Sequence, residues 1–325
     1  MIKIRVQDEK GLIETDTVKK GCWIDARNVS KDDLFRLENE FGIAGELLTD
    51  IMDADEQARI EKEDEYTAII VRLPVYDESN EVSFHTLPLG IILFSDKIVT
   101  VCQRSSGAME DILRNRLRGF SVKNKSAFVL NLLGRGAFIF LQYLKELNKR
   151  TNLIKNELQK SIKNNELIQL LSIQKSLVFF TTSIKSNELL LEKLQKSPLI
   201  RFKEDERELL EDVVIENRQA IEMANIYSSI LTGTMDAFAS VISNNLNIVM
   251  KRLTIVSIVL MIPTLIFSLY GMNVDLPFQH VSGIGWGVII LSLLAAALGA
   301  VLLNVDRRGK IWNVKKRTRL FGGKK

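Results

Sequence analysis

The first third of the chain consists of short runs in which apolar and polar residues alternate, each bounded by turn-forming residues. A period of two is typical of β-strands with one buried face, so these runs predict strands. The predicted strands are residues 2–6, 21–25, 66–75, 82–87 and 91–102. Ser30 before two early acids, with Gly42 closing the same segment, predicts a short helix, and residues 45–52 predict a second one. We therefore expect residues 1–106 to form an α/β domain.

From about residue 108 onward, the apolar positions recur every three or four residues, which is the period of one face of an α-helix. Residues 167–194 form one such run, and an earlier run carries its apolar stripe at Phe140, Leu144, Leu147, Ile154 and Leu158. Pro198 ends the pattern because proline cannot continue a helix. Residues 204–270 then predict a single helix about 100 Å long, at about 1.5 Å per residue. A helix of this length must pack against other copies or partner helices.

Two segments near the end of the chain are long and apolar enough to cross a bilayer. Residues 253–272 carry no charged side chain, and about 20 helical residues span a hydrocarbon core of about 30 Å. A second uncharged run, residues 281–305, carries glycines and alanines suited to close helix packing. Lys and Arg precede the first span and fill the tail at 306–325, whereas the loop at 274–280 has neither. The positive-inside rule thus predicts that both termini are cytoplasmic and that this loop faces outward.

One face of the first span is small and polar. Steps of three and four residues along the helix give a polar stripe made of Asn247, Met250, Thr254, Ser257, Met261, Thr264, Ser268 and Gly271. Such a stripe fits either a helix–helix contact or the lining of a wet path. Its spacing continues upstream through Asp236, Ser240 and Ser243, which favours a path, because packing seams outside the membrane are usually aliphatic. Two spans cannot enclose a pore, so a path requires several copies around one axis.

Composition and isolated residues argue against several classes of function. The 44 Lys and Arg residues nearly balance the 40 Asp and Glu residues, so the net charge of +4 predicts no nucleic-acid partner. Cys22 and Cys102 lack the spacing of a metal site or a disulfide framework, which indicates reduced thiols. His85 stands alone in a strand pattern and favours a packed or surface role. Without a phosphate-binding glycine loop, a nucleophile–base pair or clustered ligands, the sequence predicts no enzyme, and its start predicts no cleaved signal.

The motif Tyr270-Gly271-Met272-Asn273 ends the first of the two C-terminal spans, directly after the long helix. In this position it resembles the signature of the CorA-type magnesium transporter family, and the resemblance covers the whole layout. It implies an α/β cytoplasmic N-terminal domain, a long-helix stalk and two transmembrane helices, assembled as a funnel-shaped homopentamer in the plasma membrane. The expected parts are the α/β domain at 1–106, long antiparallel helices at 107–203, the stalk at 204–252, the pore-lining first span at 253–273, an outer loop at 274–280, the second span at 281–305 and a basic cytoplasmic tail at 306–325.

The resemblance also implies roles for single residues. Gly271, Met272 and Asn273 would form the ion-selectivity ring at the outer mouth, with Asn273 supplying its amides. Together with the hydroxyls of the polar stripe, the expected pore lining is Asn247, Met250, Leu253, Ser257, Met261, Thr264 and Ser268. Asp212 and Asp236 would bind regulatory Mg²⁺ between subunits, with Asp77 as a partner acid from the N-terminal domain.

These residues favour Mg²⁺ as both the transported and the regulatory ion. Mg²⁺ sheds its water reluctantly, so neutral acceptors such as the Asn273 amide suit the hydrated ion, whereas carboxylates would hold it too tightly. Softer metals prefer imidazole or thiolate, and the polar stripe has neither. Two alternatives remain open: a Co²⁺, Ni²⁺ or Zn²⁺ transporter of the same family, and a membrane-anchored helical scaffold without transport. The other expected partners are membrane lipid and further copies of the chain.

Overall fold

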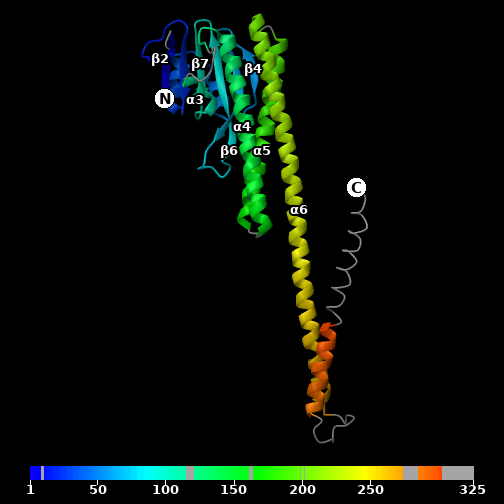
Figure 1. Ribbon diagram of the computed structural model, residues 1–325. Coiled ribbons are helices and arrows are strands. Elements are labelled where there is room, and N and C mark those ends of the chain that lie inside the picture. Colours follow the sequence, from blue (N-terminus) through cyan, green and yellow to red (C-terminus); the bar gives the residue numbers. More distant parts are fainter. Residues whose placement is uncertain are drawn as a thin grey trace, which may run out of the picture. The chain divides into compact units, whose positions relative to one another are not determined.

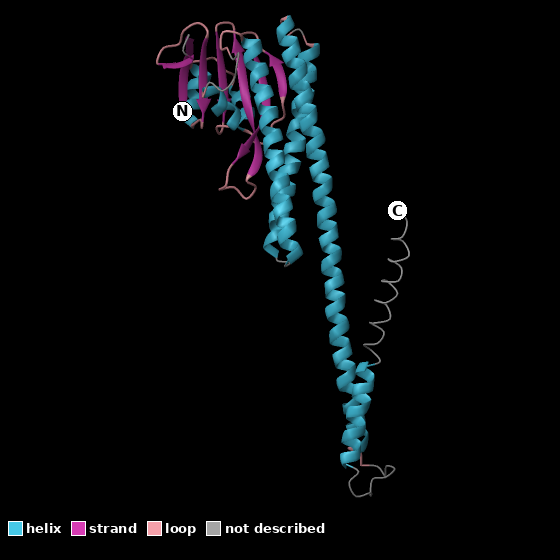
Figure 2. Cartoon of the chain, viewed as in Figure 1, coloured by secondary structure: helices cyan, strands magenta, loops and turns pink. Residues whose placement is uncertain are grey.

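The chain forms two compact units, Met1–Asp236 and Ala237–Lys325. The computed structural model describes residues 1–8, 11–114, 121–160, 164–197, 199–200, 202–273 and 285–301. The first unit contains a β-sheet with helices, and the described part of the second unit is helical (Figures 1 and 2). The long helix α6 (Glu204–Tyr270) contributes residues to both units, and it is continuous over the residues that the sequence predicts.

The first unit alternates strands and short helices before the long helices begin (Figure 2). Along the chain its elements are β1 (Ile2–Asp8), β2 (Gly11–Thr15), β3 (Cys22–Arg27), α1 (Lys31–Asn39), α2 (Gly45–Met52), β4 (Arg59–Lys62), β5 (Tyr66–Tyr76), β6 (Phe84–Phe94), β7 (Lys97–Cys102), α3 (Gly107–Leu113), α4 (Lys125–Lys160), α5 (Asn164–Lys196) and the start of α6. The strands form a seven-stranded sheet in the order β2-β1-β3-β7-β6-β5-β4. β3 and β7 pair in parallel, and the other neighbouring strands of the sheet pair antiparallel. The predicted α/β class is confirmed.

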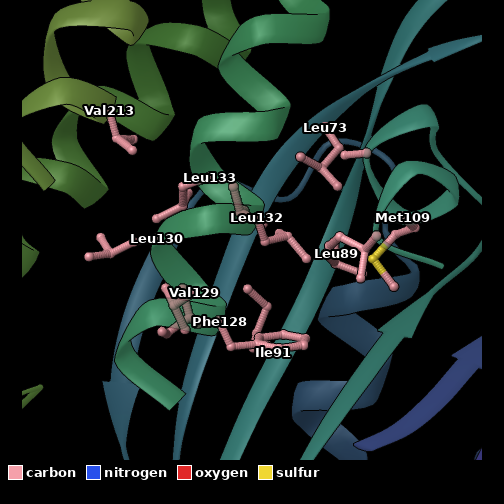
Figure 3. Packing of buried hydrophobic residues seen from close by; sticks show 14 of the residues in the cluster. Leu73, Leu89, Ile91, Met109, Phe128, Val129, Leu130, Leu132, Leu133 and Val213 are labelled. Carbon is pink, nitrogen blue, oxygen red and sulfur yellow. The ribbon is translucent and has the colours of Figure 1, made fainter. Parts of the chain in front are cut away.

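Helices cover both faces of this sheet, which gives three layers. On one face, Phe128 and Leu132 of α4 pack in one apolar cluster with Leu73, Leu89 and Ile91 of the strands (Figure 3). On the other face, a second cluster joins α1 and α2 to the alternate side chains of the strands. The inner strands are therefore buried on both sides, which explains why their sequences are almost continuously apolar.

The sequence signals for the first helix are confirmed in atomic detail. Ser30 caps α1: its Oγ accepts a hydrogen bond from the Asp33 backbone N–H at 3.2 Å, and the Asp33 carboxylate accepts one from the Ser30 N–H at 3.0 Å. Gly42 follows the helix with a φ of +69°, a conformation that side chains with a Cβ rarely adopt. α2 covers the residues predicted for it.

The sequence analysis places the gap between its last two predicted strands at residues 88–90, and this prediction is wrong. β6 is continuous, and the turn to β7 falls at Ser95 and Asp96. β6 runs through Pro88, although proline lacks an N–H group. β7 pairs with β6 only from Leu89 onward, so Pro88 has no strand on that side that would need its N–H.

A side chain of α5 replaces a missing strand beside β5. β4 pairs with β5 only as far as Ile70, and two residues later the Arg72 backbone faces α5 instead. The Arg72 N–H donates to Asn187 Oδ1 at 2.9 Å, and Asn187 Nδ2 donates to the Arg72 carbonyl at 2.8 Å. The buried Arg72 guanidinium also donates to Ser183 Oγ at 3.1 Å. Hydrogen bonds as well as apolar packing thus hold α5 against the sheet.

The N-terminal part of α6 belongs to the core of the first unit. Leu210 and Val213 join the apolar cluster that contains α4, and Ala220 is fully buried. Asn217 Nδ2 donates to the Ile184 carbonyl of α5 at 3.1 Å. Further along the helix, every residue from 239 to 254 is exposed in the single chain, so this stretch has no partner helix among the described residues.

Candidate functional site

Three of the described helices are long and apolar enough to cross a membrane by length and composition: α4, α5 and α6. In the most apolar windows of α4 and α5, 56% and 39% of the residues are buried inside the protein, whereas in α6 the share is 0%. α4 and α5 therefore use their apolar residues to cover the sheet. The apolar window of α6 has no fully buried residue, and a lipid environment can cover the apolar surface that remains exposed.

A second apolar helix, Gly285–Val301, packs against α6 within the second unit. Gly299 of this second span approaches Ile262 of α6 so closely that an added Cβ would lie 2.8 Å from Ile262 Cδ1. Val288, Ser292 and Ala296 follow the same helix face and are buried. Small residues at such a contact allow two helix backbones to approach closely. The ends of the predicted second span, residues 281–284 and 302–305, lie outside the described residues.

The second span contacts the aliphatic face of α6, which lies opposite the polar stripe. The half-buried residues of the first span are Ile255, Val259, Ile262, Pro263, Ile266 and Tyr270. At about 100° per residue, this face points about 180° away from Ser257, Thr264 and Ser268. Every residue of the polar stripe is exposed in the single chain. A contact with the second span therefore does not explain the polar stripe.

The hydroxyl groups of the polar stripe keep their capacity to accept hydrogen bonds. Ser257 Oγ donates to the Leu253 carbonyl at 3.0 Å, and Thr264 Oγ1 donates to the Leu260 carbonyl at 2.9 Å. Thr254 makes the same bond one turn earlier in the helix. Because each hydroxyl proton is used within the helix, the oxygen lone pairs are the groups that face outward. Such acceptors suit the water molecules of a hydrated cation, which present their hydrogens outward.

α6 ends directly before the Gly-Met-Asn sequence. The Gly271 N–H donates to the Phe267 carbonyl at 2.9 Å, and the Met272 N–H donates to the Leu269 carbonyl at 3.3 Å, so the last turn is tightened. Asn273 follows this turn and is exposed. The C-terminus of a helix carries a partial negative charge of about half an elementary charge. An exposed amide at this end of α6 is thus well placed to attract a cation.

Asp212 is exposed on α6, one turn before Glu216. The pKa of Glu216 is raised from its usual value, first by burial and then by the negative charge of Asp212, while Arg135 of α4 acts in the opposite direction. Acids on adjacent turns of a helix repel each other, and a cation near them relieves the repulsion. Asp212 and Glu216 thus form an acidic pair on α6, with Arg135 of α4 as the nearby positive charge.

Asp236 is exposed on the same helix, about 36 Å from Asp212 along the axis at about 1.5 Å per residue. One ion therefore cannot bind both acids of one chain. Among the described residues, no three His, Cys, Asp or Glu side chains are grouped so that they could hold a metal ion. A metal site at either acid needs further ligands from water or from another chain.

Asp77 opens the turn between β5 and β6, and both of its carboxylate oxygens have partners. Oδ2 pairs with the Arg104 guanidinium, while Oδ1 accepts hydrogen bonds from Ser79 N at 3.0 Å and Ser79 Oγ at 2.7 Å. Ser79 occupies both acceptor positions of Oδ1, so a metal ion at this carboxylate would bind Oδ2, where Arg104 competes with it. The sequence did not indicate Arg104, because nothing in its spacing predicts that it meets an acid 27 residues earlier in the chain.

Some predicted features lie outside the described residues. They are the outer loop at 274–280 and the basic tail at 306–325. The orientation of the chain in the membrane was inferred from the charges of these segments, so it stays a prediction.

An α/β domain, a long helix, and two packed apolar helices of which the first presents a polar stripe define a membrane transport protein. The family described as CorA-like Mg²⁺ transporter protein matches residues 18–308, and the chain belongs to this family. The protein is thus a membrane transporter of divalent cations and not an enzyme.

Individual relatives agree with this assignment. The cobalt/magnesium transport protein CorA of Methanocaldococcus jannaschii is 25% identical over 255 residues, which cover 77% of this chain and 79% of that protein. The protein of the same name from Thermotoga maritima is 23% identical over 304 residues, covering 89% of this chain and 83% of the relative. The complete structure of the CorA magnesium transporter from Methanocaldococcus jannaschii shares the fold with a TM-score of 0.79 at 21% identity, over 93% of this chain and 96% of that one.

Proposed function

We propose that the protein takes up Mg²⁺ through a pore lined by the polar stripe of α6. The observation that carries the proposal is that the second span covers the aliphatic face of α6 and leaves the polar stripe exposed. The Ser257 and Thr264 hydroxyls donate within their own helix, so in lipid their acceptor lone pairs would stay unused, whereas a water-filled axis supplies donors for them. A divalent-cation transporter needs such an axis, and this face of the first span is suited to line it.

We infer that the pore forms at the centre of a homopentamer. One helix face cannot enclose a path, so identical copies must surround a common axis, each with its first span inside and its second span outside. The number of subunits and the funnel shape rest on the resemblance to the CorA-type family. Exposed aliphatic side chains on the second span, such as Leu293 and Leu294, suit contact with lipid.

The order of side chains along the first span supports selection of a hydrated ion. Asn273 amides ring the outer mouth, and Thr264 provides the next polar level inward. Met261 and Leu253 provide apolar levels that block ions when they are dry. Further inward, the expected lining is Met250 and Asn247.

Regulation by intracellular Mg²⁺ is the second part of the proposal. Mg²⁺ bound between subunits at Asp212 and Asp236 would clamp the helices of neighbouring copies, and its loss would free them. Asp212 lies one turn from Glu216 and contributes to the raised pKa of that acid after burial, so a cation bound here would offset the repulsion between the two carboxylates. Asp77 of the N-terminal domain would supply a further carboxylate ligand to this Mg²⁺ once its present partner, Arg104, has moved away.

We place the protein in the plasma membrane with both termini in the cytoplasm. A membrane potential drives a divalent ion with about 4.6 kcal/mol per 100 mV, twice the value of about 2.3 for one charge. Uptake down this gradient requires no nucleotide.

Mg²⁺ flux into liposomes carrying the purified full-length protein tests the proposal. Replacing Asn273 by Ala should reduce the flux at least about tenfold, because a lost hydrogen bond to a charged partner is worth about 1.5–3 kcal/mol. Asn225→Ala, at an exposed asparagine of α6 before the span, serves as the control and should leave the flux unchanged. Size-exclusion chromatography should show intact oligomers for both variants.

The same assay separates the alternatives. Unchanged Mg²⁺ flux in assembled Asn273→Ala protein would remove the proposed selectivity ring. No cation flux in the wild type would support the scaffold. With Co²⁺, Ni²⁺ and Zn²⁺ as competitors, flux of Zn²⁺ without flux of Mg²⁺ would overturn the choice of ion.

A further inference from the structure

Three positively charged side chains, from three different segments of the chain, contact the acidic turn between β5 and β6. The pairs are Asp77 with Arg104 from the β7–α3 loop, Glu81 with Lys175 of α5 at 2.5 Å, and the Tyr76 ring with Arg150 of α4 at 5.5 Å. Arg104 differs from the other two cations because its partner is the acid that the proposed function assigns to a regulatory ion.

The two side chains of this pair differ in their exposure to solvent. The Asp77 side chain is 15% exposed and the Arg104 side chain is 51% exposed. Ser79 holds Oδ1 of Asp77 through two hydrogen bonds, so the carboxylate is fixed and Oδ2 faces Arg104. Arg104 is therefore the partner that can leave, and Oδ2 is the oxygen that its departure frees.

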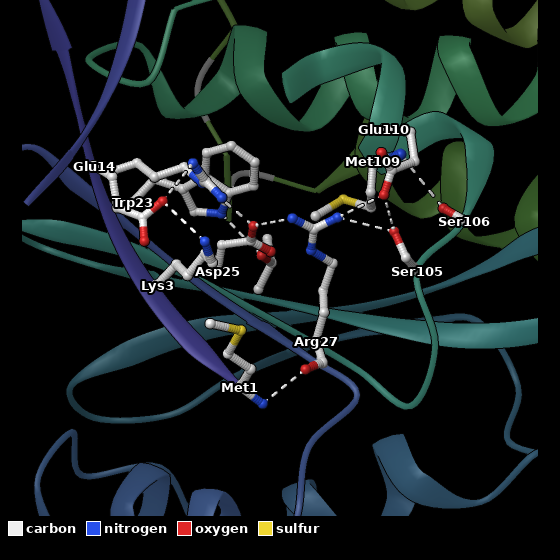
Figure 4. A network of polar contacts seen from close by, with 12 residues as sticks. Met1, Lys3, Glu14, Trp23, Asp25, Arg27, Ser105, Ser106, Met109 and Glu110 are labelled. Carbon is white, nitrogen blue, oxygen red and sulfur yellow. Dashed lines mark hydrogen bonds and ion pairs between the residues drawn. The ribbon is translucent and has the colours of Figure 1, made fainter. Parts of the chain in front are cut away.

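A partly buried polar network holds the side chain of Ser105, the residue next to Arg104 (Figure 4). Asp25 Oδ2 accepts a hydrogen bond from the Arg27 guanidinium at 2.8 Å, and Arg27 donates to Ser105 Oγ at 2.9 Å and to Glu110 Oε1 at 3.0 Å. Ser105 directly follows Arg104 in the chain. The loop is thus anchored while the Arg104 side chain extends away from it toward Asp77, which keeps the guanidinium at a high local concentration beside the carboxylate.

We propose that Arg104 is a tethered competitor for the regulatory cation at Asp77, and that it sets the Mg²⁺ concentration at which this acid takes up an ion. The inference rests on the proposed function, because it takes Asp77 as a metal ligand. Without bound Mg²⁺, Arg104 neutralises Asp77 and the turn stays closed within its own subunit. When Mg²⁺ binds, the guanidinium moves into solvent and Oδ2 becomes available to the ion.

The interaction strengths of Arg104 and Mg²⁺ with the Asp77 carboxylate fit the role of Arg104 as a competitor. A partly exposed ion pair is weak, so Arg104 shifts the binding equilibrium without preventing binding. Mg²⁺ carries twice the charge of the guanidinium, and it can keep most of its water ligands while it binds Oδ2. A tethered arginine therefore raises the concentration of Mg²⁺ required, and it does so without closing the site permanently.

The test measures protection of the full-length protein in detergent micelles against chymotrypsin as the Mg²⁺ concentration rises. Arg104→Gln should lower the midpoint of protection by about two- to fivefold, the range expected for removal of a partly exposed ion pair. Arg104→Lys keeps the charge and should stay near the wild-type midpoint. Lys175→Gln removes the same charge from the other end of the turn and should leave the midpoint unchanged, which makes it the matched control.

Substitution of Asp77 tests the metal-binding role of this acid independently of the role of Arg104. Asp77→Asn should raise the midpoint, and adding Arg104→Gln to it should have no further effect. If Asp77→Asn raises the midpoint but Arg104→Gln leaves it unchanged or raises it, the regulatory role of Asp77 stands and the competitor role of Arg104 is wrong. If Asp77→Asn does not change the midpoint, Asp77 is not a ligand of the regulatory ion, and both the role of Asp77 and the role of Arg104 are wrong.

Discussion

Gly299 of the second span lies against the end of the Ile262 side chain of α6. A Cβ at residue 299 would lie 2.8 Å from Ile262 Cδ1. The contact lies on the half-buried aliphatic face of the first span, opposite the exposed polar stripe.

Enlarging Gly299 should therefore disturb the membrane part of the protein. Gly299→Leu should lower the stability of the pair by about 1–3 kcal/mol, the usual cost of overpacking a close contact. Thermal unfolding in detergent measures the effect. Gly287→Leu is the control, because nothing lies within 4 Å of a Cβ at residue 287 in the single chain. Equal effects of the two substitutions would show that the Ile262 contact has no special weight.

Replacing Thr264 by Val keeps the volume of the side chain but removes its acceptor oxygen. Because that oxygen faces the proposed pore, we expect Mg²⁺ flux into liposomes to fall at least about threefold, as a net hydrogen bond is worth about 0.5–1.5 kcal/mol. Thr234 makes the same bond to its own helix at 2.8 Å, but it lies before the span. Thr234→Val should leave the flux unchanged, and a loss of flux in both variants would point to a general effect on the helix.

The acids of α6 should control the response to internal Mg²⁺. In the Asp212→Asn, Asp236→Asn double variant, we expect the Mg²⁺ concentration that halves the flux to rise at least about fivefold, the lower end of typical coupling between sites. The measurement is flux into liposomes preloaded with different Mg²⁺ concentrations. Glu222→Gln removes an exposed charge from the same helix and serves as the control. Normal shutdown in the double variant would exclude both acids from regulation.

Glu216 should make stability depend on pH. Its pKa is raised in the folded state, mainly by burial and then by Asp212, so its favourable contribution is complete below the usual pKa of a glutamate and is lost as the pH rises through the folded value. Glu216→Gln should therefore raise the melting temperature in EDTA at pH 7 by on the order of a degree or two, and by less as the pH falls toward 5. A gain that is the same at both pH values would contradict this explanation.

Local signals in the sequence predicted much of the fold. The cap at Ser30, the turn at Gly42 and the length of α6 follow from neighbouring residues, and all three are confirmed. The boundary between the last two strands was predicted wrongly, because it depends on which residues of β6 and β7 pair in the assembled sheet. Arg72 lies inside an apolar strand, and no local pattern shows that its guanidinium and backbone bind α5.

In the proposed site, too, some features follow from the local sequence and others only from the structure. The period of α6 predicted the polar stripe from the sequence alone, because every member lies on one helix. The face that the second span covers is visible only in the structure, since it depends on the contact of Gly299 with Ile262. The pairing of Arg104 with Asp77 joins two loops that are distant in sequence, so spacing gave no indication of it.

Asn187 binds the Arg72 peptide as a neighbouring strand would, with one donor and one acceptor in register. Sliding α5 along its own axis by one turn, about 5.4 Å, would separate both atoms from their partners. An axial shift of α5 relative to β5 would therefore break both hydrogen bonds, which ties the position of α5 to the strand that leads into the turn at Asp77.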